Sequence, residues 1–232
     1  MLLEKLIRIL KNDPGYKWES KYTFRDLEII FRNRSWQVLR GIKYKLLFKN
    51  SRGMIFIGSG VNIKHCHQIY SGSNLIIEDQ VYINALSEDG VRFGNNVSIA
   101  RSSILICTGV IAHKGKGISI GDGTGINAGA YFGGQGGITI GNNVIIGPGV
   151  KVFSENHNFS DPEILIKNQG VTRNEVIIGD NCWIGANVTI LAGVTIGPNS
   201  VIAAGAVVNK SMPGNVVIGG LPARIIKQII KE

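Results

Sequence analysis

The residue with the clearest chemical potential in this sequence is His157, within the stretch Ser-Glu-Asn-His-Asn-Phe-Ser-Asp-Pro at 154–162. An imidazole, with its usual pKa of about 6.5, can take a proton from a hydroxyl group near neutral pH. The surrounding segment, 153–176, is the longest without a regular apolar pattern, and long loops in compact repeat proteins are usually functional. His157 is therefore a candidate general base, although a lone loop histidine is often only a surface residue.

The other histidines raise the alternative of a metal site. His65 and His67 bracket Cys66, and His113 lies in another irregular segment. The apolar phase places His67 inward and His65 at a turn, so the two rings would not converge on one ion, and we expect no metal. The three cysteines have no metal or redox spacing, and their odd number does not suggest a disulfide framework, which favours a reducing cytoplasm.

A strict six-residue repeat predicts the elements that position these side chains. Aliphatic residues fall at every sixth position at Ile178, Ile184, Ile190, Ile196, Ile202 and Val208. A helix with 3.6 residues per turn would spread this stripe around its surface, whereas short strands joined by tight turns keep positions i and i−2 on one side. Three hexads would close one coil of 18 residues, so the repeat predicts a stack of parallel coils.

The repeat starts at about Ile57 and is interrupted several times. Interruptions that predict loops at the corners lie at about 85–92, 106–119, 132–139 and, the largest, 153–176. By phase, Ile126 faces inward, so the amide of Asn127 should point outward from the coil.

Nearly all of the net charge of +9 lies in the first fifth of the chain. Residues 1–52 hold 13 Lys or Arg and 5 Asp or Glu. Apolar spacing predicts helices over about 1–11 and 24–48. Two roles fit this region: an amphipathic cap over the first coil, and a basic surface for an anionic membrane. One role does not exclude the other. No recognition motif for nucleic acid accompanies the charge, so none is expected as a partner.

These hexads, the Asn-His pair at 156–157 and the spacing back to Asn127 resemble the hexapeptide-repeat acyltransferases, in particular sugar and polysaccharide O-acetyltransferases. The resemblance implies an all-β fold, with a left-handed parallel β-helix. The expected regions are a basic helical cap at 1–52, the β-helix at 53–221 with an extended catalytic loop at about 153–177, and a short C-terminal helix at 222–232.

The resemblance also implies roles for individual residues. His157 matches the general base that activates an acceptor hydroxyl for attack on acetyl-coenzyme A. Asn127 matches an amide that holds the acceptor or the tetrahedral intermediate, although asparagine also simply suits a turn. The residues expected to bind the cofactor are Trp183, Ala186, Ala204, Lys210, Arg224 and Lys227. The basic residues among them would meet phosphates, and a neighbouring subunit is the alternative partner of Trp183.

The expected activity is acetyl transfer to a sugar hydroxyl, of a cell-surface polysaccharide or its precursor. The short N-terminal motif of maltose and galactoside acetyltransferases is not found in residues 1–52, which favours the larger acceptor. The alternatives are N-acetylation of a nucleotide-linked amino sugar, an antibiotic acetyltransferase, and a non-catalytic scaffold. The resemblance implies a homotrimer with sites between subunits. Charged residues near the start argue against a signal peptide, and no apolar run is long enough to span a membrane. We therefore expect a cytoplasmic protein, with the inner face of the membrane as the alternative location.

Overall fold

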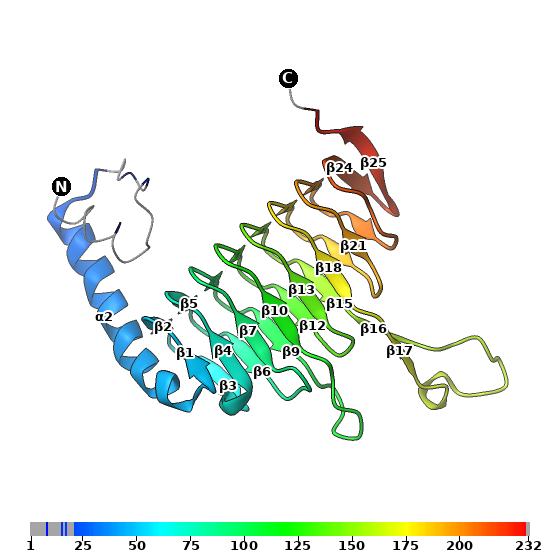
Figure 1. Cartoon of the computed structure of the whole chain (residues 1–232), viewed down its shortest axis with the longest axis horizontal. Coiled ribbons are helices and arrows are strands. Elements are labelled where there is room, and N and C mark those ends of the chain that lie inside the picture. Colours follow the sequence, from blue (N-terminus) through cyan, green and yellow to red (C-terminus); the bar gives the residue numbers. More distant parts are fainter. Residues whose placement is uncertain (1–7, 9–14, 16, 18–20, 231–232) are drawn as a thin grey trace.

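The computed structural model describes residues 8, 15, 17 and 21–230, so the helix expected over 1–11 lies almost entirely outside the described residues. The described chain forms a parallel β-helix with three flat faces (Figure 1). The all-β prediction is confirmed. In the described ranges, no helix has both the length and the apolar character needed to cross a bilayer.

Each turn of the β-helix contributes one short strand to each of three sheets. Sheet A contains, in order, β1 (Asn50–Ser51), β4 (Ile69–Ser71), β7 (Val91–Phe93), β10 (Ile118–Ile120), β13 (Ile138–Ile140), β18 (Val176–Ile178) and β21 (Thr195–Ile196). Sheet B contains β2 (Ile55–Ile57), β5 (Leu75–Ile77), β8 (Ser98–Ile99), β11 (Gly125–Ile126), β14 (Ile145–Ile146), β19 (Trp183–Ile184), β22 (Val201–Ile202), β24 (Val216–Gly220) and β25 (Ala223–Gln228). Sheet C contains β3 (Asn62–Lys64), β6 (Tyr82–Asn84), β9 (Ile104–Ile106), β12 (Tyr131–Gly133), β15 (Lys151–Phe153), β20 (Thr189–Ile190) and β23 (Val207–Val208).

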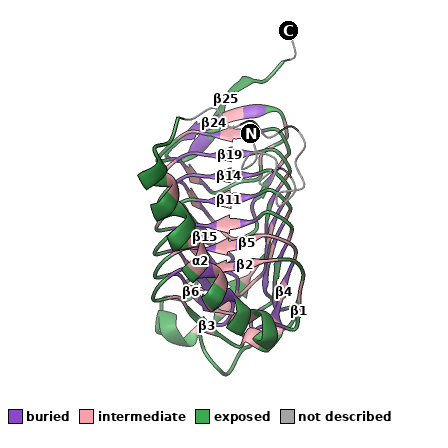
Figure 2. Cartoon of the chain, turned by 90° about the vertical axis from the view of Figure 1, so that its left-hand side faces the viewer, coloured by how far each residue is buried: buried purple, intermediate pink, exposed green. Residues whose placement is uncertain are grey.

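The register confirms the 18-residue coil. Ile178 pairs with Ile196 on sheet A, and Ile184 pairs with Ile202 on sheet B. The six aliphatic positions of the repeat from Ile178 to Val208 are buried as predicted, and the core runs through the centre of the β-helix (Figure 2). Alternation along each strand places positions i and i−2 of each hexad in this core and the residue between them outside, which is why a period of six is compatible with strands two or three residues long.

The three corners differ in chemistry. At the AB corner, which leads from sheet A to sheet B, a ladder of side chains binds the backbone of the next coil: the amide of Asn95 donates to Asp122 Oδ1 (2.7 Å), and the amide of Asp122 donates to Asn142 Oδ1 (2.8 Å). The amide of Asn142 then donates to Asp180 Oδ1 (2.7 Å). The BC corner, from sheet B to sheet C, is narrow and made mostly of small residues in the second half of the stack.

The insertions leave the coil at the third corner, the CA corner, from sheet C to sheet A (Figure 1). They comprise residues 65–68, 85–90, 107–117, 134–137 and 154–175. The first contains the 3-10 turn η1 (Cys66–Gln68), and it corrects the expectation that His67 faces inward. His67 is exposed because the turn consumes three residues, so Ile69 takes the buried position.

The helix α2 (Phe24–Leu47) begins at a capping box between Thr23 and Asp26 and packs on β2, the first strand of sheet B. Three basic or polar side chains of α2 bind this end of the coil: Arg34 contacts Glu78 (3.0 Å), Gln37 donates to Glu78 (2.8 Å) and Arg40 donates to Ile57 O (2.8 Å). The helix α2 therefore packs against the first coil.

The other end of the coil corrects a prediction. Within the segment expected as a helix at 222–232, residues 223–228 form the strand β25, which pairs antiparallel with β24. Gly219-Gly220-Leu221-Pro222 reverses the chain, and the free edge of β24 then offers backbone donors and acceptors to the returning segment. Ile225 and Ile226 suit an extended backbone, so pairing with the sheet prevails over the helical apolar spacing.

Candidate active site

His157 lies on a two-stranded antiparallel ribbon that projects from the CA corner. The strands are β16 (Glu155–His157) and β17 (Val171–Arg173), with His157 opposite Val171 and Glu155 opposite Arg173. Beyond the ribbon, the side chain of Gln169 binds the loop tip. Its Nε2 donates to Asp161 O (2.8 Å) and to Ile164 O (2.7 Å). The long loop predicted from the sequence is therefore an ordered arm that holds His157 away from the coil.

An open pocket of about 550 Å³ borders His157 on this arm. Its lining residues are Asn158, Phe159, Ser160, Asp161, Ile164, Asn168 and Gln169, the last two next to or within the 3-10 turn η2 (Ile166–Asn168). The pocket combines an exposed aromatic ring with amide, hydroxyl and carboxylate groups. Such a lining can contact the apolar face of a polar molecule and bind its hydroxyl groups at the same time.

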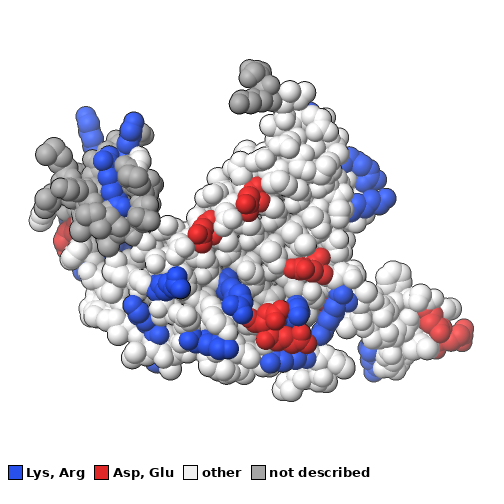
Figure 3. All heavy atoms as spheres, viewed as in Figure 1, with Lys and Arg blue, Asp and Glu red and all other residues white. Residues whose placement is uncertain are grey.

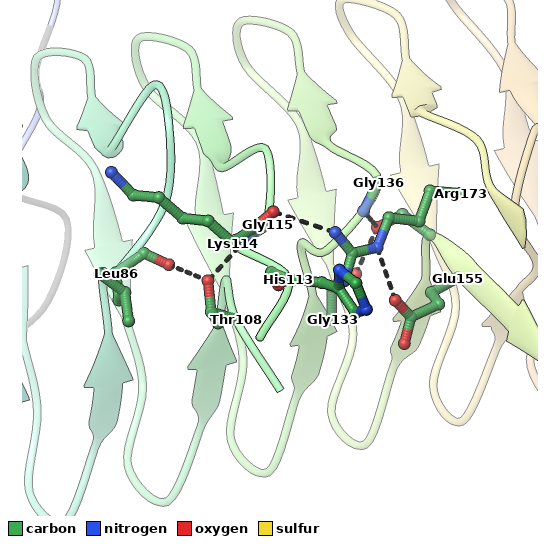
Figure 4. Close-up of polar contacts among 10 residues, drawn as sticks. Leu86, Thr108, His113, Lys114, Gly115, Gly133, Gly136, Glu155 and Arg173 are labelled. Atoms are coloured by element: carbon green, nitrogen blue, oxygen red, sulfur yellow. Dashed lines mark hydrogen bonds and ion pairs between the residues drawn. The ribbon is translucent and has the colours of Figure 1, made fainter. Parts of the chain in front are cut away.

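The base of the arm is fixed by an ion pair that the sequence did not reveal. Arg173 Nε lies 2.7 Å from Glu155 Oε2, and both side chains are largely buried. The same guanidinium donates to the carbonyl oxygens of Lys114 (2.9 Å) and His113 (3.2 Å), in the 107–117 insertion (Figure 4). Glu155 is thus engaged by Arg173, and no hydrogen bond joins it to His157 in the described arm.

Further hydrogen bonds join successive CA-corner insertions to one another. Ser154 Oγ donates to Gly133 O (2.6 Å) and accepts from the amide of Gly136 (2.8 Å). Thr108 Oγ1 donates to Leu86 O and accepts from the amide of Gly115 (2.8 Å) (Figure 4). A Cβ atom at position 115 would lie 1.6 Å from Cys107 O, so only glycine fits this contact.

Lys116, in the 107–117 insertion, is paired with two carboxylates of the 85–90 insertion. Lys116 Nζ lies 3.1 Å from Asp89 and 3.4 Å from Glu88, and these carboxylates, Asp89 first, raise the pKa of Lys116. Acidic and basic side chains accordingly lie side by side along this edge of the molecule (Figure 3). Tyr131 packs against Phe153 near the base of the arm, and burial, assisted by the charge of Glu155, raises its pKa.

Asn127 lies at the BC corner, directly after β11. Its side chain is exposed while Ile126 is buried, and its Nδ2 donates to Ile146 O (3.1 Å). A carboxamide has two N–H donors and an acceptor oxygen, so one donor and the oxygen can still meet a ligand.

Three of the expected cofactor residues share this corner. Ala186 and Ala204 occupy equivalent turns in successive coils, where the amide of Gly205 donates to Ala186 O (2.8 Å). Arg224 stands opposite Gly219 on the last hairpin, beside the turn that carries Ala203. The BC corner therefore aligns Asn127, small residues and one cation along a single edge.

The remaining expected residues lie elsewhere. Trp183 is exposed on the outer face of sheet B, in register with Ile145 of the preceding coil. Lys227 is opposite Val217 on the β24–β25 hairpin, and Lys210 follows β23 at the CA corner. Since the C-terminal segment is a strand, Lys210, Arg224 and Lys227 do not form the single basic cluster expected on a closing helix.

The three histidines considered for a metal do not gather at one point of the fold. His65 and His67 contact each other edge to face, with ring centroids 5.9 Å apart, at the first insertion, whereas His113 lies two insertions further along the CA corner. Over residues 21–230, no three His, Cys, Asp or Glu side chains gather in a metal-binding group.

Comparison with known proteins agrees with the repeat and with the coil. The family model for bacterial transferase hexapeptide repeats (six repeats) matches residues 175–210. Residues 175–210 therefore carry the repeat of the bacterial hexapeptide transferases. Left-handed winding of the β-helix is what the resemblance to this family implies.

Two similar proteins of known sequence illustrate the relationship. Galactoside O-acetyltransferase of Escherichia coli is 46% identical over 92 residues, which cover 40% of this chain and 44% of that protein. The putative lipopolysaccharide biosynthesis O-acetyl transferase WbbJ of E. coli is 37% identical over 102 residues, 41% of this chain and 52% of that protein. The chain spans about half the length of these curated relatives.

Among solved structures, a point mutant of AntD, an N-acyltransferase from Bacillus cereus in complex with dTDP and coenzyme A, superimposes with a TM-score of 0.56 at 22% identity. The match covers 89% of each chain and supports the fold alone.

Proposed function

We propose that this hexapeptide-repeat protein transfers an acetyl group from acetyl-coenzyme A to a sugar hydroxyl, with His157 as general base. The observation that carries the proposal is the position of His157 on an ordered arm, at the edge of a pocket that offers both an aromatic ring and polar groups. The E. coli relatives named above as O-acetyltransferases support oxygen as the acceptor atom and, through WbbJ, a surface polysaccharide or its precursor as the acceptor class.

The proposed reaction needs no covalent enzyme intermediate. His157 takes the proton of the acceptor hydroxyl while its oxygen attacks the thioester carbonyl carbon. The tetrahedral oxyanion is stabilised by fixed donors, for which the Asn127 amide is our candidate, and the C–S bond then breaks. The proton held by His157 passes to the departing thiolate, which leaves as coenzyme A and restores the neutral imidazole.

We assign the coenzyme A arm to the BC corner. Small side chains at Ala186 and Ala204 leave the backbone accessible to the amides of the pantetheine arm, and Arg224 offers a guanidinium suited to phosphate. Trp183 and Ile145 form an exposed apolar strip beside this corner, which favours a second subunit packed against sheet B. We therefore propose a trimer in which neighbouring chains complete each site.

The deciding experiment follows acetyl-coenzyme A consumption with simple sugars, amino sugars, nucleotide-linked sugars and isolated surface glycans. Turnover of a hydroxyl acceptor that is lost in His157→Ala supports the proposal, and turnover that survives the substitution refutes the role of His157. Turnover limited to amino sugars would replace O-transfer by N-transfer. A protein that neither turns over an acceptor nor binds coenzyme A would be a scaffold.

We further propose that α2 contacts an anionic membrane. Large apolar side chains on α2 remain exposed, at Phe24 (87%), Phe31 (74%), Leu39 (56%), Ile42 (55%) and Leu46 (83%). Their helical spacing places them on one side, and basic residues flank them at Arg25, Arg32 and Lys43. An apolar stripe edged by cations suits a surface of anionic lipid, where each basic residue contributes about 1 kcal/mol.

Flotation with vesicles tests the membrane contact. The wild type should float with phosphatidylglycerol vesicles at low salt and not with phosphatidylcholine vesicles, and Phe31→Ser with Leu46→Ser should abolish flotation. Ile111→Ser, an apolar change outside α2 at a side chain even more exposed than Phe31 and Leu46, serves as the control. A wild type that ignores anionic vesicles would refute the contact.

A further inference from the structure

The guanidinium of Arg173 joins three segments that are distant in the sequence. Its Nε–H meets Glu155 across the ribbon, while its two terminal nitrogens donate to adjacent carbonyl oxygens of His113 and Lys114, 60 and 59 residues away. The planar fork of arginine can satisfy all three acceptors in one orientation, which the point charge of a lysine cannot do. Arg173 therefore fixes the ribbon relative to the 107–117 insertion.

The position of His157 follows from this contact. Side chains two apart on a strand share a face, so His157 and Glu155 lie on the same side of β16, and Arg173 lies opposite on that side of β17. Arg173 also reaches the 107–117 insertion (Figure 4). By strand alternation, the face of the ribbon that carries His157 is therefore the face turned toward that insertion.

The 107–117 insertion is itself firmly anchored at both ends. Thr108 binds Leu86 and Gly115, and the amides of Lys116 and Gly117 donate to Gln135 O (2.9 Å) and Gly134 O (3.1 Å). Its tip is different. Val110 is 60% exposed and Ile111 is 94% exposed, which leaves two apolar side chains available for contact next to an anchored base.

We propose that Arg173 is a positioning residue that holds the His157 ribbon against the 107–117 insertion, and that the tip of this insertion forms the second wall of the acceptor site. The proposal rests on the proposed function of His157. It adds a specificity segment on the acceptor side, remote from the BC corner to which coenzyme A is assigned.

The first test compares Arg173→Gln, Arg173→Lys and the control Lys116→Gln. Lys116 lies in the same insertion, but its ion pairs go to Asp89 and Glu88 and not to the ribbon. In Arg173→Gln we expect amide exchange at 155–157 and 171–173 to accelerate at least about tenfold. We expect kcat to fall about 10- to 100-fold, since the base is displaced from its productive geometry. The KM for acetyl-coenzyme A should be unchanged, and Arg173→Lys should be intermediate.

The pH profile separates positioning from proton transfer. With the same base still acting, the plateau of kcat in Arg173→Gln should fall while the pH of half-maximal activity stays where it is in the wild type. If hydrogen exchange of the ribbon amides is unaltered in Arg173→Gln, Arg173 does not hold the ribbon against the insertion. This measurement needs no acceptor. Hydrogen exchange therefore tests the role of Arg173 even if no acceptor is turned over. The absence of turnover would instead count against the proposed function. In an active enzyme, an unaltered kcat in Arg173→Gln would overturn positioning.

The second test addresses the acceptor wall. Replacing Val110 and Ile111 together by serine removes apolar surface from an exposed tip, so the fold and the melting temperature should be retained. With the acceptor that the wild type uses, we expect KM for the acceptor to rise several-fold while KM for acetyl-coenzyme A stays constant. An unchanged acceptor KM would remove the insertion from the site.

Discussion

Within one chain, Asn127 and His157 lie beyond opposite ends of the strands of sheet C. Asn127 precedes β12 at the BC corner, whereas His157 follows β15 on the arm at the CA corner. The length of these strands separates the two residues, so one chain does not bring the proposed oxyanion donor to the proposed base. Two copies packed side by side would place the BC corner of one near the CA corner of the next.

Subunit mixing tests this arrangement. Asn127→Ala and His157→Ala should each lower kcat, Asn127→Ala by about 10²- to 10³-fold. Denaturing the two variants together and refolding them should restore about a quarter of the wild-type activity, because in randomly assembled trimers a quarter of shared sites receive both native residues. Mixing His157→Ala with the double variant should restore none. Mixed oligomers without recovery would mean that one chain supplies both residues.

Two adjacent isoleucines should differ sharply in their contribution to stability. Ile178 is 1% exposed in the coil interior, and Ile177 is 37% exposed on the outer face of the same strand. Ile178→Ala should lower the free energy of unfolding by about 2–5 kcal/mol, through lost burial and a cavity. Ile177→Ala should cost about 1 kcal/mol or less. Urea unfolding measures both, and equal losses would contradict the inward and outward assignment.

Cys107 should make stability fall at alkaline pH. Burial raises the pKa of its thiol from 9.0 to about 12. The folded state binds this proton more tightly than the unfolded chain, so the contribution is complete below about pH 9 and is lost as pH rises toward 12. Relative to Cys107→Ala, the wild type should lose up to about 1.4 kcal/mol per pH unit in that interval.

Thiol labelling provides an independent check of the same burial. At pH 8 the half-buried Cys66 should react with a disulfide reagent before Cys107 or Cys182, which should react only on unfolding. Rapid labelling of Cys107 in the folded protein would contradict its place in the core.

Gly41 should be essential for seating α2 on the first coil. A Cβ atom at this position would lie 1.8 Å from Ile55 O, so Gly41→Ala must displace the helix. We expect a loss of about 1–3 kcal/mol and faster proteolysis within α2. Ser35→Ala is the matched control, since Ser35 Oγ bonds only Phe31 O within the helix. Equal proteolysis of both variants would argue against the close contact.

The sequence was sufficient where chain-local chemistry decides structure. Ile178 and Ile196 could be placed in one buried column from spacing alone, because strand alternation and turn length repeat without change. The six-residue period predicted the wrong orientation for His67, because a 3-10 turn uses residues that the period assigns to a strand. The helix expected at 222–232 was also wrong, because Ile225 and Ile226 belong to a strand that pairs with a free sheet edge.

The candidate site was less accessible from the sequence. His157 could be named from its loop and its resemblance to a known motif, but Arg173 carried no local signal, because its backbone partners are 59 and 60 residues distant. The alternation in Val171-Thr172-Arg173, facing Glu155-Asn156-His157, could have indicated a ribbon with a cross-strand ion pair. Its contact with the 107–117 insertion depends on how coils stack, which spacing within one coil does not reveal.

The confinement of insertions to the CA corner has a consequence for how this protein can change. Ile120 pairs with Ile140, and Ile140 pairs with Ile178, although 20 residues separate the first pair and 38 the second. The pairing of strands on sheet A thus accepts coils of unequal chain length without any shift in register, because the additional residues leave and re-enter the coil at the CA corner. Under the proposed function, an acceptor-binding segment at the CA corner can be exchanged as an independent unit, while the BC corner continues to bind the acetyl donor.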